Sequence, residues 1–531
     1  MEYSCDAKLQ FQEGQQINLI VESEISRREF VKAVGMAAAG LVTQGCAGIS
    51  QRVSSRKQDK PNLLFIWTDE QRADTMAAYG NTKIHTPNLN KLARESIVFQ
   101  NAYVTQPVCT PNRSAVMTGL WPHTSGYIKN NIPLPSDIPC LPELLNDRNY
   151  RTAYMGKWHL GDEIFAQHGF EEWVSMEDGY SKYYGQTRDR SNRSDYHHFL
   201  IEKGYKPDSG GKFSRSFAAR RPIEHCKPKF LEIKACEFLR CHYKEPFILY
   251  INFLEPHMPF FGPLDNEHKP EEVNLPANFS DPLEENEPLR YRLIRQYCQQ
   301  KYGHQEKDIR NLIARYWGLV TQVDRSVGAI LATLDNLGLA ENTIVVYTSD
   351  HGDMMGSHHM VAKSVMYEEA AKIPWLMRIP QMKGRGYVIK GRASHIDMVP
   401  TLLELMGKQW SGRFSGQSLV PMIKNRKGSR VHVYIEWNPN SGAVKVKKGG
   451  TNLASKEELK HIENEHSRAV ISPDGWKLCL SDVDKCQLFN LVEDPGETIN
   501  LFDAGQHDQI IGRLTDRIHR WQETVRDKVK V

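Results

Sequence analysis

The sequence predicts an α/β protein: a large, mostly parallel sheet sandwiched by helices, followed by a smaller C-terminal antiparallel-sheet subdomain. Short apolar runs recur along the chain, and each ends in a polar cluster, as buried parallel strands do at their C-terminal ends. Helical patterns separate these runs, so the connections between strands should cover both faces of the sheet. A chain of 531 residues is too long for one ordinary core, which favours a large domain with an appendage.

The main domain is expected to begin with a strand over 62–67, an apolar run that ends at Thr68, Asp69 and Glu70. A helix should follow over 86–93, because a proline stands near its start and apolar residues recur at helical spacing. Further strands of the same buried type are predicted over 150–155, 246–253 and 343–348.

The pattern changes beyond residue 427. Short strands are predicted over 431–437, 467–471 and 476–480, the last two joined by the turn at 473–475, and an amphipathic helix over 508–525 closes the chain. A lysine-rich segment at 445–448 is interpreted as a solvated loop, with contact to an anionic polymer as the alternative. The predicted organisation is a leader over 1–58, an α/β catalytic domain over 59–427 and a C-terminal subdomain over 428–531.

The leader carries an export signal rather than a piece of the fold. Arg27 and Arg28 precede an apolar, alanine-rich run over 33–42, which is typical of a twin-arginine signal. The run is too short to span a membrane. We therefore expect export by the twin-arginine translocase to the periplasm or cell envelope, and Cys46 after Gly45 leaves lipid anchoring open as an alternative.

Composition limits the function. A hydrophobic content of 40% and a charged content of 25% are those of a soluble globular protein, and the net charge of +4 does not point to nucleic acid. The 10 cysteines form no CxxC pair, so neither a disulfide framework nor a metal finger is expected. A hairpin pair between Cys479 and Cys486 is the one disulfide that the spacing leaves open.

Residues with chemical function follow the predicted strands. Asp69 and Glu70 follow the first, and Asp350 and His351 follow the strand at 343–348. Ligands of such sheets gather at the carboxyl ends of the strands. Carboxylates are the ligands that Ca²⁺ or Mg²⁺ prefers, and His351 adds a nitrogen. These residues predict a divalent-cation site.

Cations and histidines complete the constellation. Lysines and arginines can neutralise an anionic ester beside the cation, and histidine can act as general base or acid because it titrates near neutral pH. Taken singly, each residue also has a structural interpretation, such as a helix cap for Asp69 or a solvated charge for Lys157. Their recurrence at every strand end favours hydrolysis of an anionic ester. The candidates are Arg113, Lys157, His159, His257 and Lys363.

Two segments carry a family resemblance. Cys109-Thr-Pro-Asn-Arg113, followed by Thr118-Gly119, resembles the C-x-P-x-R…T-G signature of the sulfatase family in the alkaline phosphatase superfamily, and Gly156-Lys-Trp-His-Leu-Gly161 resembles its second signature. The later elements around Asp350, Lys363 and His395 fit as well, so the resemblance spans about residues 60 to 502.

The resemblance implies a mechanism and a set of roles. A formylglycine-generating enzyme would oxidise Cys109 to formylglycine, whose hydrate attacks the sulfate ester and later expels sulfate by re-forming the aldehyde. A single Ca²⁺ would be held by Asp69, Asp350 and His351 with the formylglycine at position 109 and Glu70. The other implied roles are holding the hydrated aldehyde (Arg113), binding sulfate (Lys157 and Lys363), taking a proton (His159) and protonating the leaving alcohol (His257).

The substrate is expected to be a sulfated carbohydrate, which includes a uronic-acid polysaccharide or oligosaccharide. The segment 170–229 is rich in aromatic and basic residues that suit sulfated sugars: Trp173, Tyr180, Tyr183, Tyr184, Arg188, Arg190, Arg220 and Arg221. Glu70 and His351 depart from the commonest family pattern, which keeps a phosphonate monoester or phosphodiester hydrolase as an alternative. An inactive protein that binds sulfated glycans is the non-enzymatic alternative.

Overall fold

The computed structural model describes residues 60–282, 284–380, 386–409, 414–426, 432–439, 446 and 450–531. The predicted twin-arginine signal, Cys46 and most of the lysine-rich segment lie outside these residues. The described chain forms one compact unit. Among the helices of that unit, none has both the length and the apolar character needed to cross a bilayer.

Nine strands form the main sheet, in the order β4-β3-β5-β1-β6-β8-β2-β7, with β9 beside β2. The central strands β1 (Asn62–Asp69), β5 (Phe247–Pro256), β3 (Arg151–Gly156) and β6 (Thr343–Ser349) run parallel to one another. Strand β8 (Trp375–Arg378) is antiparallel to both of its neighbours. The predicted α/β class with a mostly parallel sheet is confirmed.

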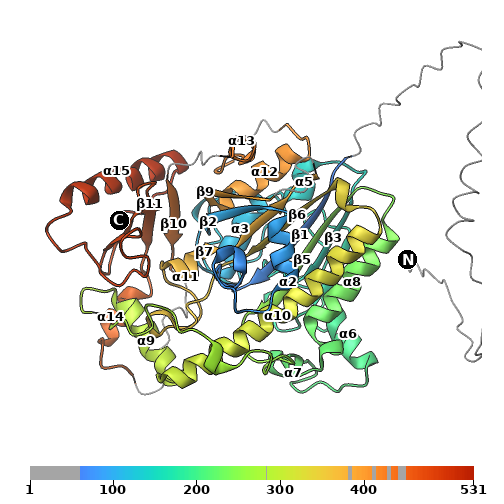
Figure 1. Ribbon diagram of the computed structural model, residues 1–531, viewed down its shortest axis with the longest axis horizontal. Helices are drawn as coiled ribbons and strands as arrows, with labels where there is room; N and C mark the ends of the chain where they lie inside the picture. The colour runs from blue at the N-terminus through green and yellow to red at the C-terminus, as the bar shows by residue number, and fades with distance from the viewer. Residues whose placement is uncertain are drawn as a thin grey trace, which may run out of the picture. The chain divides into compact units, whose positions relative to one another are not determined.

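Alternate residues of β1 point to opposite faces of the sheet, and both faces are buried. Leu63, Phe65 and Trp67 belong to one core cluster, and Leu64 and Ile66 to another. Helices cover both faces, as expected for parallel strands joined by crossovers (Figure 1). One face is covered by α2 (Pro87–Arg94), α8 (Lys227–Cys241) and α10 (Glu306–Asn336), the other by α3 (Cys109–Thr118), α5 (Leu141–Leu145) and α12 (Met398–Leu405).

A second, antiparallel sheet of four strands follows in the order β10-β11-β12-β13, and the helix α15 (Asp508–Val525) packs on it (Figure 1). Its strands are β10 (Val433–Trp437), β11 (Ser467–Ile471), β12 (Trp476–Ser481) and β13 (Gln487–Asn490). The strands β10, β11 and β12 and the helix α15 match the predicted C-terminal elements, whereas β13 was not predicted as a strand. Cys479 and Cys486 both keep free thiols, so the hairpin disulfide that the spacing left open is absent.

The two sheets share a core and a buried ion cluster. Val433 and Ile435 of β10 belong to the same hydrophobic cluster as one face of the main sheet. Lys477 of β12 is buried and pairs with Glu497 at 2.8 Å and with Glu368 at 3.2 Å. The predicted domain boundary at residue 428 falls just before β10 and stays a prediction, because this interface joins the two parts into one unit.

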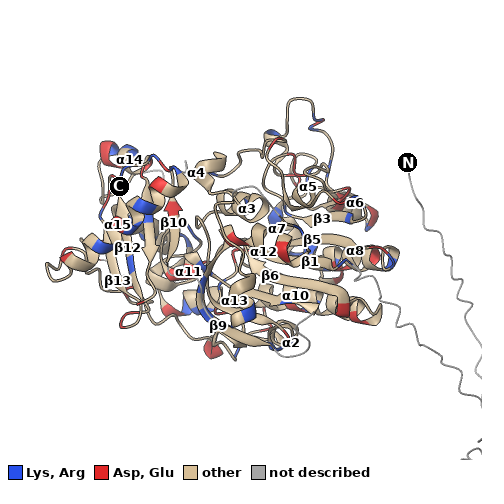
Figure 2. Cartoon of the chain, turned by 90° about the horizontal axis from the view of Figure 1, so that it is seen from above, with Lys and Arg blue, Asp and Glu red and all other residues tan. Residues whose placement is uncertain are grey.

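The remaining elements connect the layers. They are β2 (Ile97–Tyr103), β4 (Glu172–Ser175), β7 (Lys372–Ile373), β9 (Tyr387–Ser394), α4 (Pro122–Ser125), α6 (Asp195–Glu202), α7 (Arg215–Ala219), α9 (Leu289–Tyr302), α11 (Glu368–Ala371), α13 (Val420–Asn425) and α14 (Lys456–Ile462). Charges of both signs lie on the same elements, as the blue and red segments of α8 and α14 in Figure 2 show. Such mixed charge does not favour a nucleic-acid backbone as partner.

Candidate active site

The parallel pairing of β1 and β6 brings two acidic residues to one edge of the sheet. Thr68 is paired with Ser349, so Asp69 and Asp350 follow at neighbouring strand ends. The backbone N–H of Glu70 donates to Asp350 Oδ1 at 3.0 Å, which ties the two ends together. Asp69 and Asp350 are both fully buried, so each carboxylate needs a cation or donors close by.

Arg113 on α3 meets that need. Its Nη2 donates to Asp69 Oδ2 at 2.9 Å and its Nε to Asp350 Oδ2 at 2.8 Å, and the side chain is fully buried. Its Nη1 donates to Asn252 Oδ1 on β5, and the guanidinium lies 4.8 Å from the Trp67 ring centroid. Arg113 therefore fixes the spacing of the two carboxylates and connects α3 to three strands of the sheet.

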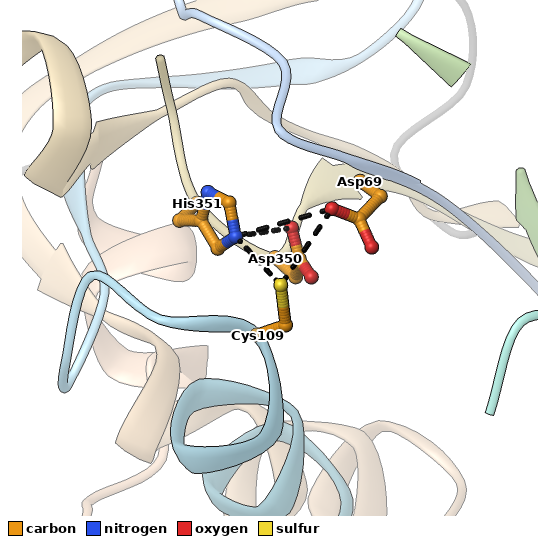
Figure 3. Close-up of side chains that lie close together, drawn as sticks. All are labelled: Asp69, Cys109, Asp350 and His351. Atoms are coloured by element: carbon orange, nitrogen blue, oxygen red, sulfur yellow. Dashed lines mark hydrogen bonds and ion pairs between the residues drawn. The ribbon is translucent and has the colours of Figure 1, made fainter. Parts of the chain in front are cut away.

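Cys109 begins α3, as predicted, and lies beside these carboxylates (Figure 3). Its Sγ is 3.2 Å from His351 Nε2 and 3.8 Å from Asp69 Oδ1. One ligand atom from each of Asp69, Cys109, Asp350 and His351 lies within 4.8 Å of the others. His351 Nδ1 is 2.8 Å from the Gly352 carbonyl oxygen, so it carries the proton, and Nε2 is left to face the group.

Glu70 has different partners from those four residues. Its Oε2 lies 3.0 Å from Lys363 Nζ and 3.3 Å from His257 Nε2. Burial raises the pKa of Glu70 to about 7, although the positive charge of Lys363 opposes the rise. A metal-ligand role for Glu70 stays a prediction, and it rests on the separate group that Glu70 forms with Asp69 and His257.

Lys157 reaches the same edge from the end of β3. Its Nζ makes an ion pair with Asp69 Oδ2, and both side chains are buried. Burial alone would raise the pKa of Asp69, but the positive charges of Lys157 and Arg113 outweigh it and hold that pKa well below its usual range. Asp69 is thus an ionised carboxylate at neutral pH.

His159 lies two residues beyond Lys157 in a left-handed backbone conformation, with a φ of 58°. The carboxylate of Glu163 accepts the backbone N–H groups of Trp158 and His159 at 2.9 and 2.7 Å, which holds this turn in place. Burial lowers the pKa of His159 well below its usual value, and the charge of Lys157 lowers it further. The neutral imidazole can accept a proton, as a general base must.

His257 and Lys363 lie on the other side of Cys109. Burial lowers the pKa of His257, and the charge of Lys363 adds to this effect. Lys363 stays charged, because the acidic groups of Cys109 and Glu70 raise its pKa against the effect of burial. The ten predicted site residues are thereby brought together at one end of the main sheet.

Two cavities meet at these residues. One of about 490 Å³ contains Cys109, Lys157 and His159, and the other of about 640 Å³ extends past Asn131, Ile132 and Tyr302. His257 and Lys363 line both. The reacting position therefore lies at the junction of two arms, which gives a substrate room on either side.

The aromatic and basic segment at 170–229 contributes to the first cavity, but mostly through other residues than its predicted arginines. Tyr180 and Tyr183 line it, together with Arg215, which was not among the predicted residues. The remaining predicted residues pack elsewhere or face solvent: Trp173 on Tyr154, Tyr184 near Phe165, Arg188 on Phe165, Arg220 on Phe261 and Arg221 on Phe217, with Arg190 exposed.

Several residues that support the site were not predicted from the sequence. Asn252 accepts from Arg113, and Asn131 Oδ1 lies 3.0 Å from His159 Nε2. The hydroxyl of Thr110 donates to the His159 carbonyl at 2.8 Å. Asn252 had a detectable signal, because it is an amide within an otherwise apolar strand, whereas Asn131 lies in a loop that gives none.

Gly156, at the end of β3, occupies a position that only glycine can fill without strain. Its φ is 111°, and an added Cβ would lie 2.0 Å from the Asn252 carbonyl oxygen. Gly156→Ala should therefore combine a backbone strain of about 1–2 kcal/mol with an overpacking penalty of about 1–3 kcal/mol, and it should displace Lys157. Urea unfolding measures the loss of stability.

Gly80→Ala is the matched control, because Gly80 has a φ of 101° but open space within 4 Å of an added Cβ. It should show the strain alone, at about 1–2 kcal/mol, with ester hydrolysis unchanged. Equal destabilisation by the two substitutions would show that the close approach to Asn252 has no energetic weight.

Comparisons with known proteins agree with this geometry. The family model described as Sulfatase matches residues 61–408, and the one described as N-sulphoglucosamine sulphohydrolase, C-terminal, matches residues 356–524. The chain is 30% identical to an ulvan-active sulfatase of Formosa agariphila over 69% of this chain and 65% of that protein. It is 25% identical to an N-acetylglucosamine-6-O-sulfatase of Bacteroides thetaiotaomicron over 92% and 90%. A phosphonate monoester hydrolase from Silicibacter pomeroyi shares the fold, with a TM-score of 0.72 at 21% identity over 88% and 96%.

Proposed function

The chain belongs to the sulfatase family of the alkaline phosphatase superfamily and is a sulfuric ester hydrolase, and from this we propose its substrate class and its mechanism. The proposed reaction removes sulfate from a sulfated carbohydrate, with formylglycine made from Cys109 as the nucleophile and one Ca²⁺ as cofactor. The observation that carries the proposal is the position of Cys109: its Sγ lies beside Asp69 and His351, in a cavity that Lys157 and Lys363 also line.

The donor set fits a hard divalent cation. Asp69 and Asp350 offer carboxylate oxygens that Arg113 holds in place, and His351 offers Nε2 because its Nδ1 is engaged by a carbonyl. With formylglycine at position 109, an oxygen would replace the sulfur of this group, which suits Ca²⁺ better than a thiol does. When bound, the cation supplies Lewis-acid stabilisation of the charge on the sulfate oxygens.

The remaining residues have separate tasks. Lys157 and Lys363 hold the sulfate group through their ammonium charges, and Arg113 holds the hydrated aldehyde at position 109. His159, neutral and buried, takes a proton from that group at its unpartnered Nδ1. His257 lies at the junction of the two cavities and passes a proton to the leaving alcohol. Because its pKa is lowered, it takes that proton from Glu70, whose pKa is about 7 and whose Oε2 lies 3.3 Å from His257 Nε2. The space in both cavities supports a substrate in which the sulfated sugar unit has neighbouring sugar units on both sides.

A phosphonate monoester or phosphodiester hydrolase is the second candidate function. The fold shared with a phosphonate monoester hydrolase and the presence of His351 favour it. Kinetics with matched aryl esters of sulfate and phenylphosphonate decide between the two, because the sulfatase proposal requires the larger kcat/KM on the sulfate ester. An inactive glycan-binding protein is disfavoured, because all the predicted catalytic residues are present at one site.

The formylglycine mechanism predicts that Cys109→Ala abolishes sulfate-ester hydrolysis, by at least about 10³-fold in kcat, while folding is retained, because one small side chain contributes little packing energy. Cys109→Ser should behave likewise in a host that does not oxidise serine at this motif. Thermal unfolding and turnover of 4-nitrophenyl sulfate measure the two effects. Wild-type turnover by Cys109→Ala would refute the mechanism.

The cation site predicts stabilisation by Ca²⁺. A bound ion at a concentration of 100 Kd should add about 2.7 kcal/mol to the free energy of unfolding, and chelation should remove it. His351→Ala should weaken this response, because it deletes a ligand but leaves both carboxylates paired with Arg113. Asp482→Asn is the control and should respond like the wild type, because Asp482 pairs with His466 and belongs neither to the two cavities nor to the group of ligand atoms. A Ca²⁺ response that survives His351→Ala undiminished would place the ion elsewhere.

Export and maturation are proposed to occur in a fixed order. Every residue of α3 is buried, so a modifying enzyme can reach Cys109 only before folding is complete. The twin-arginine route carries folded proteins, and the signal at Arg27 and Arg28 lies outside the described residues. Oxidation of Cys109 in the cytoplasm should therefore precede transport to the periplasm or cell envelope.

Replacing Arg27 and Arg28 by Lys tests this order. The double variant should remain in the cytoplasm with Cys109 already oxidised and with wild-type specific activity. Cell fractionation, mass spectrometry of the Cys109 peptide and a sulfatase assay measure this. Retention of a folded but unoxidised protein in a competent host contradicts the order, and normal export contradicts the twin-arginine assignment.

A further inference from the structure

Arg215 is a cation in the wall of the reaction cavity that the mechanism does not use. It begins α7, whose N-cap Ser214 accepts the backbone N–H of Phe217. Asp208 accepts both the N–H and the hydroxyl of Ser214, at 2.7 and 2.6 Å. The backbone that presents Arg215 is thus fixed by its own hydrogen bonds, and the side chain lines the cavity that contains Cys109.

One edge of the Arg215 guanidinium is held and the other is open. Its Nε donates to Glu177 Oε2 at 2.8 Å, and its Nη2 donates to the same oxygen and to the Tyr180 hydroxyl, the latter at 2.8 Å. Among the described residues, no acceptor receives a hydrogen bond from Nη1, and 31% of the side chain is exposed. Arg215 is therefore oriented by the protein but keeps donors for a ligand.

The charge around Arg215 is not balanced. The carboxylate of Glu177 pairs with both Arg215 and Lys227, so one acid faces two cations. Glu255, which lies near Lys227, has a pKa raised to about 7 by burial and is only partly ionised at neutral pH. Lys182 adds a positive charge to the lining of the cavity, and Asp178, which pairs with His197, adds a negative one. The cations of this wall outnumber its ionised acids, so the wall can bind an anionic group of the substrate other than the reacting sulfate.

Tyr180 connects this wall to the reaction centre. Its ring centroid lies 4.7 Å from that of His159, and its hydroxyl oxygen accepts from Arg215, so the hydroxyl proton can be donated to a ligand. Arg215 is therefore separated from the proposed general base by a single tyrosine side chain.

We propose that Arg215 and Tyr180 form a second oxyanion subsite, which binds a carboxylate or an additional sulfate on the sugar whose ester is cleaved. The inference rests on the proposed function and deepens it, because it makes the substrate at least dianionic. An arginine suits this task, since its charged Nη1–H donors stay free for a carboxylate or sulfate while Glu177 and Tyr180 hold Nε and Nη2.

Selectivity between matched substrates tests the subsite. The substrate pairs are monosulfated hexuronates against the corresponding neutral hexose sulfates, and disulfated against monosulfated glucosamine. Arg215→Gln should lower the ratio of kcat/KM within a pair by about 10- to 100-fold, because a charge-assisted hydrogen bond is lost. The hexuronate pair reports on a carboxylate and the glucosamine pair on a second sulfate. Arg220→Gln, at the far end of α7 and stacked on Phe261 outside the cavity, should leave both ratios unchanged.

The subsite and the proposed function can fail separately. An unchanged ratio in Arg215→Gln, or no preference for the dianionic partner in the wild type, overturns the subsite while the sulfatase activity stands. If no sulfate ester is turned over, the proposed function fails, and calorimetric binding of the same ligands to Cys109→Ala with and without Arg215→Gln decides the subsite. Arg215→Lys separates charge from geometry: it should keep folding, which thermal unfolding checks, but recover the ratio only in part.

Discussion

The buried pairing of Arg113 with Asp69 and Asp350 is the interaction on which the rest of the site depends. Two carboxylates at neighbouring strand ends repel one another and lose hydration, and a single guanidinium with one donor for each offsets both effects. The same side chain donates to Asn252 and to the Lys157 carbonyl, so it also sets where β5 and the end of β3 lie relative to Cys109. With the Arg113 guanidinium in this position, both carboxylates stay ionised. Their remaining oxygens can therefore bind a metal cation as well.

Sequence reasoning predicted most of the site because its chemistry is concentrated in short segments. Cys109 and Arg113 share one helix, and Asp350 and His351 are consecutive, so their proximity needs only the right strand order. The central strands were predicted for a related reason: both faces of the sheet are buried, and β1, β5 and β6 read as continuous apolar runs. A continuous apolar run does not reveal which residues of β1 pack on which face, so the division of β1 between two core clusters was not predicted.

Long-range geometry explains what was missed. The partners of Glu70 come from segments far away in the sequence, and nothing around Lys363 indicates that it would meet this carboxylate. The arginines of the 170–229 segment look alike in the sequence. Those that stack on a surface ring cannot be told there from Arg215, which reaches the cavity, because the difference lies in the direction of α7. Composition located the wall of the cavity, and only the fold decided which residues face it.

The complete burial of α3 also bears on how this protein can be altered by directed evolution. Each of its ten positions contacts the interior, so a combinatorial library in that helix would consist largely of unfolded members. The cavity wall differs, because Tyr183 and Lys182 are partly open to solvent and belong to a segment with short helices and turns. A library confined to that wall can change which sugar is accepted while the machinery that cleaves the ester stays intact.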